Sequence, residues 1–425
     1  MTTDDERVAD LLRRLDDEPV GPPRIDLPGA IREARRRRRN RRVAAAGAVA
    51  LGVLAVAVLP GALRGDGRAA PAPAVSPNPS APSPKPRPTG PWQGVCGVEL
   101  LPVPDDALGS EVTGGDPDGR WLVGRQIPRD LRSYRLLIWD GDRVREVELP
   151  GADQELRDVN RAGLAVGSTG VALPMSQAWA VHDGEAVRLL GISSGAARAV
   201  NDAGRIVGFR NAEEVKEPWA APRPVVWDSY RAEAVDLPLP GPQWSGSAID
   251  IDEDGTILGE LADMAGAVEP GQPRHLVVWR PGAARPEVLP LPRVPGGTAS
   301  RFYAVSLAGG WVTGIAARDL PGKPRSAAKE YAVRIDLRTG TVDVLPRVVA
   351  AGTGNGRGWL AGVQSSNSTG SIPFVVTDTK TVKLPGLNAA GGDGGWVRSL
   401  SDDGRVLGGQ LFPNHQGRAV RWTCR

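Results

Sequence analysis

The sequence predicts an all-β protein built on a seven-bladed β-propeller, preceded by a single transmembrane helix and a proline-rich stalk. A motif of one turn and one strand recurs seven times after residue 93, at intervals of 41 to 55 residues. Gly and Pro number 54 and 39 of the 425 residues, against four Phe and four Tyr, which disfavours a helical enzyme. One uncharged run of 21 residues, at 43–63, follows a block of arginines.

The net charge of +3 comes entirely from residues 1–42, which hold twelve Arg and nine acidic residues. The other residues carry 40 basic and 40 acidic side chains. A broad basic face for nucleic acid is therefore not expected. The arginines concentrate at 35–42, directly before the uncharged run.

The run at 43–63 would span ~30 Å as a helix, the hydrocarbon thickness of a bilayer. Arginines on its N-terminal flank predict a cytoplasmic tail (1–42) and an extracellular C-terminal domain at the cell membrane. A cleaved signal peptide is the alternative, although its charged region would be unusually long. Residues 64–92 hold nine prolines and predict an extended stalk. The composition of the tail is similar to that of actinobacterial membrane proteins, so regulation through the tail stays open.

Residues 93–425 are predicted to form the propeller. In the repeated motif an Asx or Ser can bond the backbone two residues on, and a Gly can take the positive φ of the turn. The seven copies run from Asp116 to Gly124, Asn160 to Gly167, Asn201 to Gly208, Asp252 to Gly259, Ala308 to Gly314, Asn355 to Gly362 and Ser401 to Gly408.

Each turn motif is followed by an apolar strand, which in four copies ends on Trp. A Leu-Pro or Leu-Gly pair follows this strand in the first six copies, and one further pair precedes the first turn. About four short strands in each of seven units indicate a propeller. The pairs begin at Leu101, Leu149, Leu190, Leu237, Leu289, Leu345 and Leu384.

The units resemble extracellular HAF-type repeats, with the pattern Ile-Asn-x-x-Gly-x-Val-Gly followed by His-Ala-Phe-x-Trp. Residues 201–208 (NDAGRIVG) and 275–279 (HLVVW) carry the resemblance best. It implies a propeller-like extracellular protein, anchored in an actinobacterial membrane, and implies no reaction.

The order of the repeats predicts how the ring closes. A Leu-Pro strand around Val98 precedes the first turn, whereas the last unit ends at Trp422 without one. The N-terminal strand should therefore complete the last blade. Cys96 and Cys424 would then lie on adjacent antiparallel strands, and outside the membrane they are expected to form a disulfide.

No cofactor or metal is expected. Residues 250–255 (DIDEDG) resemble the start of a calcium loop, but Leu261 stands where a bidentate Glu is needed. Three scattered His residues make neither a zinc site nor a visible catalytic triad. An enzymatic alternative stays open, namely a hydrolase or lyase that acts on carbohydrates through carboxylates alone. Propellers can host such an enzyme without a local sequence motif.

The leading interpretation is a non-enzymatic binding or display module at the cell surface, for an extracellular protein or glycan. The loops from second to third strands and the connections between blades share one face and vary in length, which favours that face for binding. Eight of twelve tryptophans occupy repeated positions and are expected to be framework. Trp92 is expected in the stalk, and Trp219, Trp244 and Trp396 are the candidate ligand-binding residues.

Overall fold

The computed structural model describes residues 90–104, 107–128, 134–172, 175–211, 222–264, 274–345, 350–366, 370–387 and 394–425. The predicted tail, transmembrane run and all but the last residues of the predicted stalk lie outside these ranges. Within them, the helices are the single turns η1 (Arg325–Ala327) and η2 (Pro413–His415), and no helix there could cross a bilayer.

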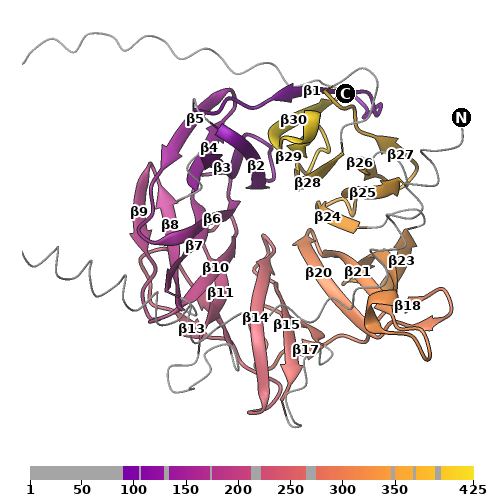
Figure 1. Cartoon of the computed structure of the whole chain (residues 1–425). Coiled ribbons are helices and arrows are strands. Elements are labelled where there is room, and N and C mark those ends of the chain that lie inside the picture. The colour runs from indigo at the N-terminus through magenta and orange to yellow at the C-terminus, as the bar shows by residue number, and fades with distance from the viewer. Residues whose placement is uncertain are drawn as a thin grey trace, which may run out of the picture. The chain divides into compact units, whose positions relative to one another are not determined.

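The described residues form seven four-stranded antiparallel sheets that follow one another around a ring, as predicted (Figure 1). In each blade the chain passes from the innermost strand outward. Blade 1 holds β2 (Ala107–Gly115), β3 (Trp121–Pro128), β4 (Arg135–Asp140) and β5 (Arg143–Val147). Blade 2 holds β6 (Ala152–Val159), β7 (Ala165–Ala172), β8 (Met175–His182) and β9 (Glu185–Arg188). Blade 3 holds β10 (Gly195–Val200), β11 (Ile206–Arg210), β12 (Arg223–Trp227) and β13 (Val235–Asp236).

The next three blades repeat this order. Blade 4 holds β14 (Trp244–Ile251), β15 (Ile257–Asp263), β16 (His275–Trp279) and β17 (Glu287–Val288). A hairpin of β18 (Arg293–Val294) and β19 (Gly297–Thr298) follows. Blade 5 holds β20 (Arg301–Ala308), β21 (Trp311–Arg318), β22 (Lys329–Asp336) and β23 (Thr341–Leu345). Blade 6 holds β24 (Ala350–Gly354), β25 (Leu360–Ser366), β26 (Gly370–Val376) and β27 (Thr381–Lys383).

Blade 7 closes the ring in the predicted way. Its inner strands are β28 (Gly395–Leu400), β29 (Val406–Leu411) and β30 (Arg418–Cys424), and its outer strand is β1 (Cys96–Leu100). The indigo β1 lies beside the yellow β30 in Figure 1. Cys96 and Cys424 face each other in this register and form the predicted disulfide.

The core of the propeller lies between the blades. Among the described residues, seven clusters of buried apolar side chains each join two neighbouring sheets. Between blades 1 and 2, for example, Leu136 packs in one cluster with Leu156 and Trp179. Burial of these side chains between sheets is what holds the blades together.

The repeated turn makes contacts within its blade and to the next one. Asn160 Oδ1 accepts hydrogen bonds from the N–H groups of Ala162 (3.1 Å) and Leu164 (3.0 Å). Its Nδ2 donates to the carbonyl of Asn201, the equivalent residue of the next blade, at 2.9 Å. Gly163 has φ +80°, as expected for the turn. The recurring Asn therefore joins neighbouring blades as well as shaping the turn.

The recurring Trp and Leu-Pro elements also meet. The indole Nε1 of Trp139 donates to the carbonyl of Pro102 (2.7 Å), and that of Trp227 donates to Leu190 (2.8 Å). Trp279 and Trp422 do the same to Pro238 and Pro385. Each indole thus secures the connection that enters its blade, which explains why the two elements recur together.

A β-bulge interrupts every innermost strand at the same place. In blade 3 the extra residue is Arg198, and the backbone around it approaches Gly208 of the second strand. A Cβ on Gly208 would lie 2.0 Å from the carbonyl oxygen of Ala196. This close approach explains the last Gly of each repeat. In blade 7 the equivalent residue is Gly409, one position after the Gly408 predicted from the spacing, because the turn there is one residue longer.

Trp92 corrects one expectation about the stalk. Its ring centroid lies 5.0 Å from that of Trp359, and its Nε1 donates to the carbonyl of Gly404 at 3.0 Å. Gln93 and Val95 also donate to the C-terminal Arg425 through their backbone N–H groups. These contacts place residue 92 against blades 6 and 7.

Candidate functional site: the central channel

The innermost strands of all seven blades surround a cavity of about 630 Å³ along the axis of the propeller. We call this cavity the channel. We call the face with the repeated turns the turn face, and the face with the second-to-third-strand loops and the connections between blades the loop face. Each innermost strand runs from the loop face to the turn face, so the later residues of the strand lie closer to the turn face.

The bulges arrange the channel side chains in two layers. The bulge layer, nearer the loop face, consists of Thr113, Arg157, Arg198, Ile249, Val305, Gly352 and Arg398. The deep layer is formed by the residues that follow them, namely Gly114, Asp158, Ala199, Asp250, Ser306, Thr353 and Ser399. Charged and hydroxyl side chains dominate both layers, so the channel offers hydrogen-bonding and ionic groups.

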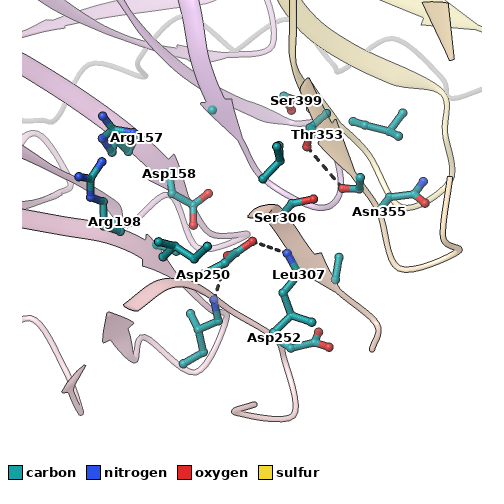
Figure 2. A pocket seen from close by; sticks show the side chains of 18 of the residues that line it. Arg157, Asp158, Arg198, Asp250, Asp252, Ser306, Leu307, Thr353, Asn355 and Ser399 are labelled. Atoms are coloured by element: carbon teal, nitrogen blue, oxygen red, sulfur yellow. Dashed lines mark hydrogen bonds between the residues drawn. The ribbon is translucent and has the colours of Figure 1, made fainter. Parts of the chain in front are cut away.

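Two aspartates stand in the deep layer, each bonded to the next blade. Asp158 Oδ2 accepts a hydrogen bond from the Val200 N–H at 2.8 Å, and Asp250 Oδ2 accepts one from the Leu307 N–H at 2.6 Å. Figure 2 shows both carboxyl groups directed into the same part of the channel. Each carboxyl group retains lone pairs for another donor.

Burial shifts the pKa values of these acids upward. It raises the pKa of Asp158 to about 7, although the N–H groups of Val200 and Val159 oppose the shift. Burial also raises the pKa of Asp250 well above its ordinary value, and the charge of nearby Asp158 adds to the effect. Glu260, on the neighbouring strand β15, shows a raised pKa for the same primary reason. Near neutral pH the deep layer can therefore both donate and accept protons.

Arginines gather toward the loop face. Arg157 forms an ion pair with Glu155 at 2.9 Å, and Arg274 forms one with Glu260 at 3.5 Å. Arg198 has no hydrogen-bond partner for its buried Nε among the described residues. Burial, together with the nearby charge of Arg157, lowers the pKa of Arg198 to about 10. It still carries a positive charge at neutral pH.

The turn-face end of the channel is spanned by Arg161. Its guanidinium contacts Asp118 of blade 1 and Asp402 of blade 7, both at 3.0 Å, and also Asp202 of blade 3. Asp402 and Glu253 line this end of the channel, and Arg161 lies 3.9 Å from Glu253. These ion pairs join the turns of separate blades across the axis, so the loop face is the end at which a ligand could enter.

Within the described ranges, no group of three or more His, Cys, Asp or Glu side chains is placed to hold a metal ion. The residues of the rejected calcium loop serve the framework instead. Asp252 accepts hydrogen bonds from the N–H groups of Gly309 (2.9 Å) and Gly310 (2.7 Å) in the next blade. Asp250 holds Leu307 as described above.

The three candidate tryptophans do not form one cluster in the described residues. Trp219 lies in 212–221, outside them. Trp244 begins β14, half-buried against the core between blades 3 and 4, with its ring 5.0 Å from that of His275. Trp396 is 38% exposed on β28, two residues before Arg398 of the bulge layer. Trp244 and Trp396 both lie on innermost strands, and neither lines the channel; Trp396 is the nearer of the two to the bulge layer along its strand.

The turn motifs alone do not reveal the channel residues, because these residues lie in the columns that precede the turns. Asp158 and Asp250 both stand two residues before the Asx of their turn. Arg157, Arg198 and Arg398 stand three residues before the Asx or Ser of theirs. Alignment of those columns across the seven repeats would have revealed a polar column and a basic one. Their convergence in one cavity, however, depends on ring closure.

The chain matches no known family model, and no curated protein matches it in sequence. Among solved structures, the β-propeller domain of the Trilobed protease from Pyrococcus furiosus is 12% identical, with a TM-score of 0.49, over 74% of this chain and 95% of that one. An oligogalacturonate lyase from Vibrio parahaemolyticus is 12% identical, with a TM-score of 0.47, over 77% of this chain and 97% of that one. A prolyl endopeptidase structure is 11% identical, with a TM-score of 0.49, over 75% of this chain and 51% of that one. This chain therefore spans about half the length of that endopeptidase.

Proposed function

We propose that this protein is a membrane-anchored extracellular binding module whose propeller takes its ligand into the channel from the loop face. The observation that carries the proposal is the channel itself. It is polar, it is lined by all seven blades, it is spanned by Arg161 at the turn face, and it carries arginines toward the loop face. A concave site with a few convergent charged groups on a rigid scaffold is the common form of a binding site.

The location rests on the sequence. The arginine block before the uncharged run at 43–63 favours a single span with the N-terminus in the cytoplasm. The resemblance to extracellular HAF-type repeats supports the same orientation. The disulfide between Cys96 and Cys424 fits an oxidising compartment.

Two experiments test this proposal. Protease added to intact cells should cleave the proline-rich stalk and release the propeller, whereas a propeller protected inside intact cells would refute the orientation. A screen of the full chain, purified in detergent, against neutral and acidic glycans and peptides should yield a ligand. Replacement of Arg398 should weaken that ligand, because Arg398 lines the channel.

A second candidate function is a carbohydrate hydrolase or lyase in the same channel. The specific observation in its favour is the pair Asp158 and Asp250, whose raised pKa values suit proton transfer near neutral pH. Both carboxyl groups already bond the next blade, which is a framework role. Turnover of a glycan that is lost in Asp158→Asn, with binding retained, would establish the enzyme over the binding module.

A further inference from the structure

The arginines at the loop-face end of the channel outnumber the acids that pair with them. Arg157 and Arg274 have Glu155 and Glu260 as partners. Arg398 is exposed, and within the described residues no hydrogen bond or ion pair engages its guanidinium. The guanidinium of Arg198 lies over the Phe209 ring at 5.3 Å, and its buried Nε has no hydrogen-bond partner there. Because no acid in the described residues forms an ion pair with Arg198 or Arg398, these two guanidinium groups are the ones left for an anion. Guanidinium groups bind carboxylates through paired hydrogen bonds.

Exposed aromatic rings stand at the same end. Trp396 is 38% exposed and Tyr303 is 43% exposed, and each lies two residues before the bulge of its strand. Because side chains two residues apart in a strand point to the same side, Trp396 and Arg398 share one side of β28. Tyr303 lines a second cavity with Arg274, which also lines the channel. Aromatic faces beside charged groups suit the stacking of sugar rings.

The deeper lining favours sugars over peptides. The deep layer offers the hydroxyl groups of Ser306 and Thr353 and the carboxyl groups of Asp158 and Asp250, which can bond sugar hydroxyls. Large apolar side chains enter the two layers only as Ile249 and Val305, so pockets for apolar peptide side chains are few.

We propose that the loop-face end of the channel binds an acidic oligosaccharide, whose carboxylates pair with Arg198 and Arg398 and whose rings stack on Trp396 or Tyr303. This inference rests on the proposed binding function and names its ligand class.

The test uses the full chain, purified in detergent, and isothermal titration with three probes. These are a uronic-acid hexasaccharide, the same oligosaccharide with its carboxylates reduced to alcohols, and hexaglutamate. We expect the uronic-acid probe to bind at least tenfold more tightly than the other two.

The variants locate the site. Arg398→Ala should weaken the uronic-acid probe about tenfold, equivalent to ~1.4 kcal/mol, because a charge-assisted hydrogen bond is lost. Trp396→Ala should weaken it several-fold through lost stacking. Arg143→Ala, on the outer strand of blade 1, is the matched control and should leave affinity unchanged. Arg198→Lys keeps the positive charge but loses the planar guanidinium group, so this variant should also bind the uronic-acid probe more weakly. If Arg198→Lys does not fold, the variants of Arg398 and Trp396 provide the test, because both side chains are exposed.

Several outcomes would overturn the inference. Equal affinity for the reduced oligosaccharide would exclude recognition of the carboxylates. Tighter binding of hexaglutamate would show that the ligand is an acidic peptide and not an oligosaccharide. No binding of the uronic-acid probe, or unchanged affinity in both Arg398→Ala and Trp396→Ala, would also overturn it. In these cases the binding function survives if the wider screen yields a ligand that Arg398→Ala weakens, and fails if it yields none.

Discussion

The last Gly of each repeat is required by the bulge in the neighbouring strand. A Cβ on Gly124, Gly167 or Gly208 would lie 1.9–2.0 Å from a backbone carbonyl oxygen of the innermost strand. A backbone atom cannot move aside as a flexible side chain can. The same bulge places the next side chains in the channel, so the repeat Gly and the channel layers have one cause.

Gly208→Ala should therefore lower the free energy of unfolding by about 2–3 kcal/mol, as overpacking does in a close-packed interior. Gly97→Ala is the matched control, because Gly97 also lies in a strand and has no atom within 4 Å of its built Cβ. Chemical denaturation of both variants measures the difference. An equal decrease in the free energy of unfolding of the two variants would show that the backbone around Gly208 relaxes at little energetic cost.

The raised pKa values of two aspartates predict how the stability of the propeller depends on pH. The pKa of Asp158 is about 7 in the folded protein against an ordinary 3.8, and burial raises the pKa of Asp116 to about 6. Between pH 4 and 7 the folded state therefore holds protons that the unfolded chain has released, and stability from these groups falls as pH rises. The melting temperature should be lower at pH 8 than at pH 5 by this contribution.

Asp158→Asn should make the fall in melting temperature between pH 5 and pH 8 smaller, because the amide cannot ionise. Its oxygen can still accept the hydrogen bond from the Val200 N–H. Asp140→Asn serves as the control. Arg120 lowers the pKa of Asp140, so its carboxyl is ionised in both folded and unfolded states above pH 5. An Asp158→Asn protein with the same decrease between pH 5 and 8 as the unchanged protein would contradict the assignment.

At the level of elements, β1 and β30 close the ring by backbone pairing and by one covalent bond. Cys96 and Cys424 are 328 residues apart in sequence, and their Cα atoms are 4.0 Å apart. Closure of so long a loop contributes roughly 6 kcal/mol in the chain-entropy model. Five residue pairs of β1 and β30, from Cys96 with Cys424 to Leu100 with Val420, remain in register without it.

Replacement of both cysteines by Ser should lower the melting temperature and leave the fold intact. Non-reducing peptide mapping of the exported protein should recover Cys96 joined to Cys424. Free thiols in that protein, together with unchanged melting of the double variant, would contradict a structural role for the bridge.

For the molecule as a whole, the described propeller begins near residue 90, and its ring is closed by β30, which ends at Cys424. All seven sheets and the seven clusters between them lie within these limits. The fragment 90–425 should melt at the temperature of the full chain. The fragment 101–425 with Cys424→Ser lacks β1, leaves β30 as an open edge and should melt below the double cysteine variant. Equal melting of those two proteins would show that β1 contributes nothing beyond its disulfide.

The number of blades, the closure by β1, the disulfide and the framework role of the repeated tryptophans were all predictable from the sequence. These features follow from turn chemistry, strand periodicity and the order of the repeats, which adjacent residues encode. The packing of Trp92 against the propeller was not predictable, because its contact, Trp359, is distant in sequence.

The channel could not be derived in this way. Arg161 meets Asp402 across 241 residues, and the two layers exist only when seven bulged strands converge on one axis. Burial then sets the pKa values of Asp158 and Asp250, and burial is a property of the closed ring. The repeats encode each blade locally, whereas the chemistry of the axis arises from side chains that meet only after the last blade joins the first.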